Sequence, residues 1–265
     1  MGTLKDKVVV VTGASRGLGE SMAIGFAEQG ANLTLAARTE PDLEKVAAAC
    51  REAGAGDVRV AQTDISSEAD VQKLVDDTIS ARGRIDVFVA NAGTSYANFT
   101  DKHYRELVTY DLEIIEQLFK VNVFGTWLCM KAALPIMEEG GSFIAIGSET
   151  GRVLYPGAGA YAVTKSTIDA MVTLTARESA TKGVRVNCLS PGGMVDTQLF
   201  GPNGMPEWLK QQHPPLPADV IVPAALWLAS EDSAGITGAF ISGKEFNASS
   251  PQQMRASLES SAQKH

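Results

Sequence analysis

Short apolar runs alternate with longer amphipathic segments along the chain. Seven runs rich in Val, Ile, Leu and Ala contain few polar residues, which is the pattern of strands buried on both faces of a sheet. We expect strands at residues 8–13, 32–38, 58–64, 85–93, 142–148, 184–192 and 238–243. Because helical segments separate them, the pattern predicts one α/β domain: a doubly wound parallel sheet of about seven strands with helices on both faces.

Local signals place helix starts and irregular regions. Pro41 suits the first turn of a helix, and Ser67 resembles a helix N-cap. Residues 94–120 are longer and more polar than a simple crossover, and residues 193–217, rich in Pro and Gly, are predicted to fold over the site as a lid. The domain is predicted to cover residues 1–248, with 249–265 as a loose polar tail.

Composition and charge narrow the possible partners. The chain of 265 residues has a formal net charge of -8, which argues against a nucleic-acid or anionic-membrane role. No apolar stretch is long enough to span a membrane and the N-terminus lacks a signal-peptide core, so we expect a cytoplasmic protein. The three cysteines are expected to be reduced and buried, and the scattered histidines do not support a metal site.

The sequence TGASRGLG, residues 12–19, follows the first predicted strand. A strand, a tight glycine turn and a helix N-terminus together form a binding site for a pyrophosphate, because backbone N–H groups and the helix dipole face the anion. Gly13, Gly17 and Gly19 leave room for close approach, and Ser15 and Leu18 supply further backbone groups. The alternative is an ordinary glycine-rich turn, which the position after the first strand makes less favoured.

The end of the second strand bears on the choice of dinucleotide. An acidic residue there would hold the ribose 2′-hydroxyl of NAD, but the strand ends with two alanines and Arg38. Arg38 and Arg16 favour NADP(H), because guanidinium groups clamp a 2′-phosphate. The alternative is that both are solvated surface arginines. Asp64, after the third strand, is a candidate acceptor for the adenine amino group or a helix-capping residue.

The sequence YAVTK, residues 161–165, places a phenol and an ammonium one helical turn apart. Taken alone, Tyr161 and Lys165 form an ordinary half-exposed pair. Ser148 follows the fifth predicted strand, at the edge of the sheet where open α/β proteins bind ligands. Its hydroxyl is suited to hydrogen-bond a carbonyl oxygen, or alternatively to cap a loop.

Six motifs occur in the order found in the short-chain dehydrogenase/reductases, and the chain resembles the compact single-domain branch of that family up to about residue 243. The motifs are TGASRGLG, ANAG at 90–93, Asn122 in VNVFG, Ser148, YAVTK, and SPG at 190–192. The resemblance implies a Rossmann-like fold and an oxidoreductase. It also implies a homo-dimer or homo-tetramer, with helices 102–137 and 160–181 at a two-fold interface.

The resemblance assigns roles residue by residue. Asn122, Ser148, Tyr161 and Lys165 match the catalytic tetrad, with Lys165 also holding the nicotinamide ribose and Asn122 anchoring a water chain. The remaining matches concern the cofactor: Asn91, Ala92 and Gly93 beside the adenine ribose, and Pro191 and Gly192 at the nicotinamide end. Asp64 and Ile65, after the third strand, are further candidate cofactor residues. One departure concerns a family Thr five residues after the Pro, where this chain has Asp196. Met194 or Thr197 is therefore the candidate carboxamide contact.

These residues predict reversible reduction of a ketone or aldehyde to an alcohol. NADPH supplies the hydride, and Tyr161 is the general acid in reduction and the base in oxidation, with its pKa lowered by Lys165 and the oxidised nicotinamide. Apolar lid residues favour an uncharged substrate with a hydrophobic part, although they are equally suited to packing. Candidate substrate residues besides Ser148 and Tyr161 are Glu149, Tyr155, Leu199, Phe200 and Trp208, with Tyr96 nearby.

Three other functions stay open. A sugar-nucleotide epimerase or dehydratase shares the Tyr–Lys spacing but usually has a different glycine motif and a larger C-terminal domain. An NAD-preferring alcohol dehydrogenase on the same fold differs in cofactor preference. A non-catalytic dinucleotide sensor has no need of a proton donor such as Tyr161.

Overall fold

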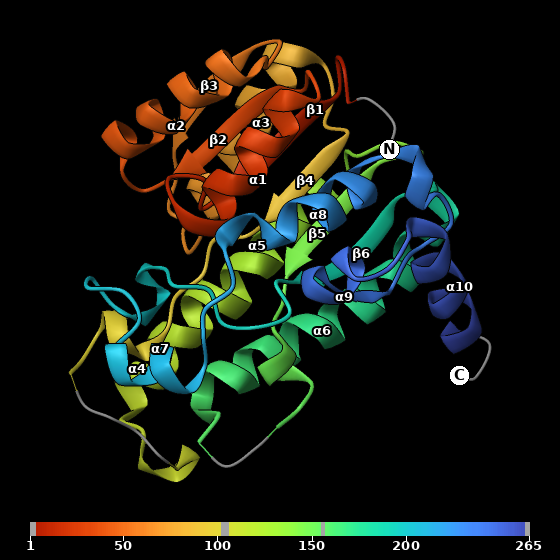
Figure 1. The fold of residues 1–265 in the computed structure, drawn as a ribbon. Coiled ribbons are helices and arrows are strands. Elements are labelled where there is room, and N and C mark those ends of the chain that lie inside the picture. The colour runs from red at the N-terminus through yellow and green to blue at the C-terminus, as the bar shows by residue number, and fades with distance from the viewer. Residues whose placement is uncertain (1–3, 102–105, 155–156, 263–265) are drawn as a thin grey trace.

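The computed structural model describes residues 4–101, 106–154 and 157–262. These residues form a seven-stranded parallel sheet in the order β3-β2-β1-β4-β5-β6-β7 (Figure 1). All seven predicted strands are confirmed; five are slightly shorter than their apolar runs, and β4 and β7 cover half of theirs or less. They are β1 (Val8–Thr12), β2 (Asn32–Ala37), β3 (Val58–Gln62), β4 (Val87–Ala90), β5 (Ser142–Ile146), β6 (Arg185–Ser190) and β7 (Phe240–Ser242).

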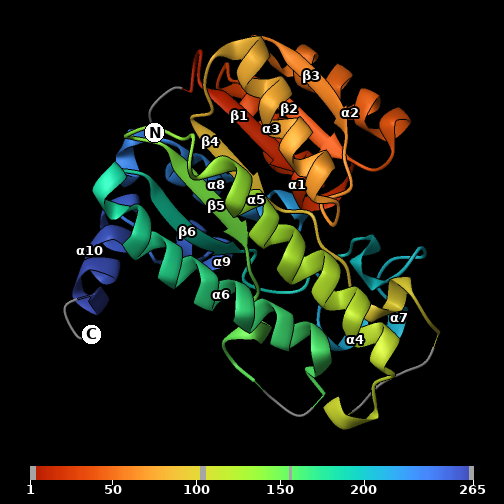
Figure 2. The same ribbon diagram turned by 180° about the vertical axis from the view of Figure 1, so that it is seen from behind.

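Helices cover both faces of the sheet, as Figures 1 and 2 show from opposite sides. Alternate strand residues point to opposite faces, so Val9 and Val11 belong to one apolar core and Val10 to the other. The first core is closed by α1 (Gly17–Glu28), α2 (Glu40–Ala53), α8 (Val222–Ala229) and α9 (Gly243–Asn247). The second is closed by α3 (Glu68–Arg82), α5 (Gly125–Ala133) and α6 (Gly159–Ser179).

The predicted helix starts are confirmed. Pro41 lies in the first turn of α2. The Ser67 hydroxyl caps α3 by accepting from the Asp70 backbone N–H at 3.3 Å, and it donates to the Asp70 carboxylate at 2.9 Å. The three cysteines are buried and free, as predicted. Among the helices of the described ranges, none combines the length and apolar character needed to cross a membrane.

The C-terminal segment is a helix, and the prediction of a loose tail was wrong. Helix α10 (Pro251–Ala262) begins with a reciprocal cap: the Gln253 N–H donates to the Ser250 hydroxyl at 3.2 Å, and the Ser250 N–H donates to the Gln253 side chain at 2.8 Å. Met254 and Leu258, one turn apart, pack against the first core. An amphipathic stripe and a capping pair therefore outweigh the polar composition of this segment.

The two long irregular regions lie against each other at the carboxyl edge of the sheet. The first contains η1 (Tyr96–Asn98), η2 (Leu107–Thr109) and α4 (Leu112–Leu118), and the second contains α7 (Glu207–Gln212). Ser95 donates a hydrogen bond to the Leu199 carbonyl, and the Asn98 side chain donates to the same oxygen at 3.3 Å. The 193–217 segment is therefore tied directly to the chain that leaves β4.

Candidate active site

The predicted functional residues follow the carboxyl ends of four neighbouring strands. The glycine loop follows β1, Asn91 follows β4, Ser148 follows β5, and Pro191 follows β6. Sheet order reverses between β1 and β4, since β2 lies on the other side of β1 (Figure 1). Such a reversal leaves a crevice outside the strand ends, which is where open α/β sheets bind ligands.

The glycine loop is closely packed by backbone. Gly13 and Gly17 have φ values of 63° and 60°, a region that side chains strain, and α1 begins at Gly17. A Cβ at Gly19 would lie against the Gly13 carbonyl and 2.6 Å from the Asn91 side-chain nitrogen. The loop therefore presents backbone groups at a helix N-terminus, and a dinucleotide pyrophosphate fits these residues.

Asn91 and Thr12 hold the glycine loop against the end of β4. The Asn91 amide donates to the carbonyls of Thr12 at 2.9 Å and Gly13 at 3.1 Å. The Thr12 hydroxyl accepts from the backbone N–H groups of Asn91 at 3.0 Å and Ala92 at 3.2 Å, and it donates to the Val89 carbonyl. Sequence reasoning missed the role of Thr12, although it lies inside the quoted motif.

Asn122 lies in η3 (Phe119–Phe124), a π-helical segment between α4 and α5, and is fully buried. Its side-chain oxygen accepts from the Thr94 N–H at 2.8 Å. Its amide nitrogen donates to the Thr94 carbonyl at 2.9 Å and to the Thr164 hydroxyl at 3.1 Å. Thr164 in turn donates to the Tyr161 carbonyl at 2.7 Å, so Asn122 is linked to the helix that carries Tyr161. Neither threonine was predicted, although Thr164 lies inside YAVTK and Thr94 directly follows ANAG.

Ser148 is the N-cap of η4 (Glu149–Gly151), which packs tightly on α6. A Cβ at Gly151 would lie 2.7 Å from the Lys165 backbone, so glycine permits this approach. The Ser148 and Thr150 hydroxyls are 2.9 Å apart, and the Thr150 N–H donates to Ser148 at 3.3 Å. Thr150 was not predicted from the sequence, and it fixes the orientation of the Ser148 hydroxyl.

Tyr161, Lys165 and Ser148 are brought together by α6 and η4. The Lys165 ammonium lies 5.6 Å from the centre of the Tyr161 ring, and it donates to the Ile146 carbonyl at 2.8 Å. The Ser148 side chain lies close enough to the Tyr161 hydroxyl to lower the pKa of the phenol. Gly93 faces the same group, since a Cβ there would lie 3.8 Å from the Lys165 ammonium.

Burial dominates the titration of this group. It raises the pKa of the Tyr161 phenol well above 10, and the hydrogen bond with Ser148 lowers it only in part. Burial also lowers the pKa of Lys165 to about 8, while the Cys188 thiol opposes that change. The expectation that Lys165 and the oxidised nicotinamide of a bound dinucleotide together lower this pKa stays a prediction. A raised pKa keeps the phenol protonated, which is the state that a proton donor needs.

At the adenosine end, Arg16 and Arg38 are exposed. Burial alone would raise the pKa of Asp64, but two hydrogen bonds from Ser66 and the positive charges of Arg38 and Lys120 hold it below its ordinary value. Asp64 Oδ1 thus accepts both hydrogen bonds from Ser66 and stabilises the turn after β3. Ile65 is buried beside it. Lys120 was missed, because nothing in the linear sequence places it near Asp64.

The lid brings Thr197 to the glycine loop. A Cβ at Gly17 would lie 3.1 Å from the Thr197 methyl group, and the Thr197 hydroxyl accepts from the Leu199 N–H at 3.3 Å. The Gly192 N–H donates to the Ser190 hydroxyl at 3.3 Å, which shapes the turn after β6. The Met194 carbonyl accepts from Leu216, within the lid. Thr197 thus lies against the predicted pyrophosphate loop.

The candidate substrate residues differ in their placement. Leu199 and Phe200 are half-buried in the lid, whereas Trp208 on α7 is 58% exposed. Tyr155 lies outside the described residues. Glu149 follows Ser148 directly and accepts a hydrogen bond from the Ser190 hydroxyl, so it lies between the ends of β5 and β6.

Comparison with known proteins connects this geometry to characterised relatives. A family model described as enoyl-(acyl carrier protein) reductase matches residues 13–242. Glucose 1-dehydrogenase of Gluconobacter oxydans is 35% identical over 241 residues, covering 88% of each chain. Short chain aldehyde dehydrogenase 1 of Euphorbia lathyris is 31% identical over 254 residues, covering 89% of this chain and 85% of that protein.

A solved structure shows the same likeness in three dimensions. Carveol dehydrogenase from Mycobacterium avium, solved in complex with NAD, is 27% identical and superposes with a TM-score of 0.80. The match covers 91% of this chain and 97% of that one.

Proposed function

This chain belongs to the short-chain dehydrogenase/reductase family, and we propose that it is an NADP(H)-dependent enzyme that reversibly reduces a ketone or aldehyde to an alcohol. It is an oxidoreductase of that family's type and uses a nicotinamide dinucleotide. One observation carries the reaction class: Ser148, Tyr161 and Lys165, from two different elements, meet at the carboxyl edge of the sheet.

In the proposed mechanism the dinucleotide, when bound, supplies a hydride, and side chains of the protein hydrogen-bond and protonate the carbonyl oxygen of the substrate. Thr150 holds Ser148, whose hydroxyl hydrogen-bonds the carbonyl oxygen and stabilises the negative charge that develops there. Tyr161 donates its phenolic proton to that oxygen in reduction and accepts it back in oxidation. The Lys165 ammonium stabilises the phenolate that remains.

Asn122 is proposed as a positioning residue within this mechanism. Both of its amide hydrogens are engaged, by Thr94 and Thr164, so the side chain fixes the distance between the end of β4 and α6. Its backbone carbonyl accepts from the Thr126 hydroxyl at 2.7 Å. Asn122 thereby holds Tyr161 and Gly93 in register on either side of the crevice.

The preference for NADP(H) rests on Arg16 and Arg38. Both side chains are exposed and free of ion pairs within the described residues, so their guanidinium groups are available to a 2′-phosphate. The second candidate is a preference for NAD, favoured by the NAD in the carveol dehydrogenase structure.

Replacing Arg38 with Ala is expected to raise the KM for NADPH about tenfold or more while leaving the KM for NADH nearly unchanged, because a charge-assisted hydrogen bond contributes roughly 1.5–3 kcal/mol. Arg59→Ala is the matched control, since Arg59 is exposed on β3 and pairs with Asp57 at 3.4 Å. Steady-state kinetics with both dinucleotides measure the effect. A wild-type affinity for NADH equal to that for NADPH would show the assignment to be wrong.

The substrate is proposed to be uncharged with a hydrophobic part. Leu199, Phe200 and the buried Met205 give the lid an apolar character. Acyl carrier proteins are acidic partners, and the net charge of -8 disfavours their approach. The negative net charge therefore favours a free small molecule over an acyl chain that is bound to an acidic carrier protein.

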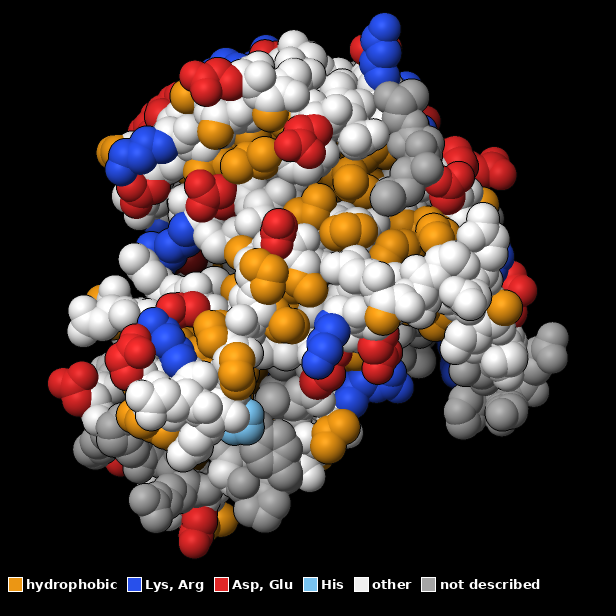
Figure 3. Space-filling model, in the orientation of Figure 1, with side chains coloured by type: hydrophobic (Ala, Val, Ile, Leu, Met, Phe, Trp, Pro, Cys, Tyr) orange, Lys and Arg blue, Asp and Glu red, His pale blue; other side chains and the backbone are white. Residues whose placement is uncertain are grey.

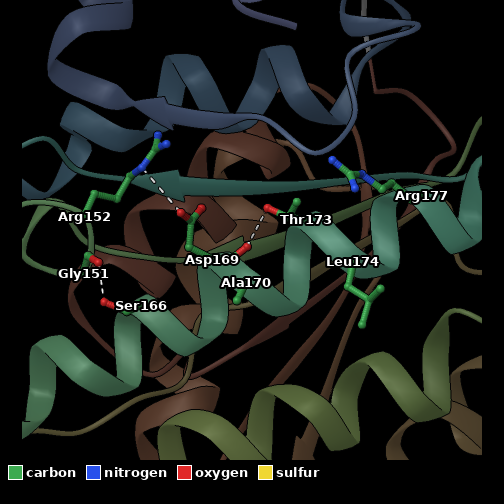
Figure 4. Close-up of a pocket in the computed structure, with 8 residues that line it drawn as sticks. All are labelled: Gly151, Arg152, Ser166, Asp169, Ala170, Thr173, Leu174 and Arg177. Carbon is green, nitrogen blue, oxygen red and sulfur yellow. Dashed lines mark hydrogen bonds and ion pairs between the residues drawn. The ribbon is translucent and has the colours of Figure 1, made fainter. Parts of the chain in front are cut away.

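We also propose that the protein forms a homo-dimer or homo-tetramer through α5 and α6. Figure 2 shows these helices side by side on one face. Phe124, Trp127 and Leu174 there are each about half exposed. A hollow of about 540 Å³ lies along α6, and Figure 4 shows the residues that line it. Arg177 on its rim offers a positive charge to a second copy related by a two-fold axis, whereas Asp169 is paired with Arg152 at 3.4 Å.

Light scattering is expected to give two or four times the chain mass of 28.0 kDa. Leu174→Glu should shift the protein towards the monomer, because it places a charge in an apolar interface, whereas Lys45→Glu on α2 should not. A monomeric wild type would contradict this proposal.

A second apolar surface lies over α1 and α8 (Figure 3).

A further inference from the structure

The carboxylate of Glu149 is held beside the proposed reaction centre. Glu149 follows Ser148 in the chain, and its Oε2 accepts a hydrogen bond from the Ser190 hydroxyl. Ser190 ends β6, directly before the Pro191–Gly192 turn. The carboxylate is therefore fixed between the ends of two strands, next to the hydroxyl proposed to bind the substrate carbonyl.

The second oxygen of this carboxylate has no partner. Glu149 Oε1 is enclosed, and none of the described residues donates a hydrogen bond to it. A buried acceptor without a donor costs about 1–3 kcal/mol, and native proteins rarely retain one that no ligand or water satisfies. The residue as a whole is half-exposed, so part of it reaches solvent although Oε1 does not.

Among the residues that the structure describes, no cation forms an ion pair with Glu149. Arg152 lies 3.4 Å from the Asp169 carboxylate and stacks on the Phe240 ring at 4.7 Å. Lys165 donates to the Ile146 carbonyl. The free oxygen is therefore an acceptor that would repel a substrate carboxylate, and an apolar group beside it would leave it without a partner. Because the substrate is proposed to be uncharged, the donor that this oxygen receives is a neutral one.

We propose that Glu149 accepts a hydrogen bond from a hydroxyl on the carbon next to the reacting carbonyl, so that the substrates are α-hydroxy ketones or aldehydes and the products vicinal diols. Ser148 and Glu149 are consecutive in the chain, and the two side chains are proposed to serve adjacent groups of one small molecule. This inference rests on the proposed carbonyl reduction and names its substrate class. The apolar lid then contacts the remainder of the substrate.

Matched carbonyl pairs test the inference: hydroxyacetone against acetone, 1-hydroxy-2-butanone against 2-butanone, and 2-hydroxyacetophenone against acetophenone. The wild type is expected to prefer the hydroxylated member by about 10- to 100-fold in kcat/KM. Glu149→Leu removes the acceptor and should reduce that ratio to within about threefold of unity. Glu149→Gln keeps an acceptor oxygen and should retain part of the preference.

The cofactor carboxamide is the other neutral donor that could reach Glu149. Fluorescence titration of NADPH distinguishes the two: unchanged affinity in Glu149→Leu supports the substrate hydroxyl, and a loss of affinity overturns it. Inhibition of the wild type by 1,2-propanediol, compared with 2-propanol, provides a test that needs no variant. Stronger inhibition by the diol supports the inference, and equal inhibition contradicts it.

Failure of the inference and failure of the proposed function give different results. If plain ketones are reduced as efficiently as their hydroxylated partners, the role of Glu149 is wrong and carbonyl reduction stands. If no member of any pair is reduced with either dinucleotide, the proposed function is wrong and the inference falls with it.

Discussion

Tyr161→Phe is expected to lower kcat by about 10²- to 10⁴-fold, the usual contribution of a positioned general acid. The phenolic proton is the group proposed to reach the substrate oxygen, and Ser148 lies close enough to the phenol to lower its pKa. Phe keeps the ring that lies 5.6 Å from the Lys165 ammonium, so packing and local charge are preserved. The loss is therefore assigned to the proton and not to the fold.

Stopped-flow or steady-state assays measure this loss, and fluorescence titration shows whether the variant still binds the dinucleotide. Binding should be nearly unchanged, because the glycine loop, Asn91 and Arg38 are untouched. Ser148→Ala provides a comparison, with a smaller expected loss, since it removes a hydrogen bond and leaves the proton donor. Turnover of Tyr161→Phe within tenfold of wild type would exclude Tyr161 as the general acid.

Lys165→Met is expected to change the pH dependence of stability as well as to reduce turnover. Lys165 is 5% exposed, and burial lowers its pKa from 10.5 to about 8 in the folded protein. Below pH 8 the group is charged in both the folded and the unfolded states, and its burial penalty acts in full. Between pH 8 and 10.5 the unfolded chain binds more protons, so wild-type stability rises with pH.

Between pH 8 and 10.5, the lowered pKa of Lys165 raises the free energy of unfolding of the wild type by roughly 3 kcal/mol. Urea denaturation of both proteins without dinucleotide at pH 7, 8, 9 and 10 measures it, because groups common to both cancel in the difference. The free energy of unfolding of wild type minus that of Lys165→Met should increase with pH. A constant or decreasing difference would show that Lys165 is not held as a buried ammonium.

Much of the fold and part of the site could be predicted from local sequence. Buried strands appear as runs such as Val8–Val11, and the glycine loop and Tyr161–Lys165 lie in short segments whose spacing alone implies shared faces. Helix α10 also has a local signal: Ser250 and Gln253 form a capping pair, although the segment that follows is polar in composition.

Other features depend on contacts between distant segments. Thr94 and Thr164 become partners of Asn122 only when β4, η3 and α6 meet, and Lys120 approaches Asp64 only across two crossovers. The Ser190–Glu149 hydrogen bond likewise joins residues 41 positions apart. Hydrophobic patterning specifies which surfaces pack, but it does not specify which polar side chains then face each other.

The π-helical segment Phe119–Phe124 makes the geometry of the site depend on chain length. A π turn holds one residue more than an α turn, so the side chains after it are out of phase with those before it by about 100°. This offset lets Ile114 and Leu118 face one apolar cluster and Leu128 and Cys129 another, along a single continuous rod. Deleting one residue from the segment would restore regular winding and turn Asn122 away from Thr94, with every proposed catalytic side chain still present in the sequence.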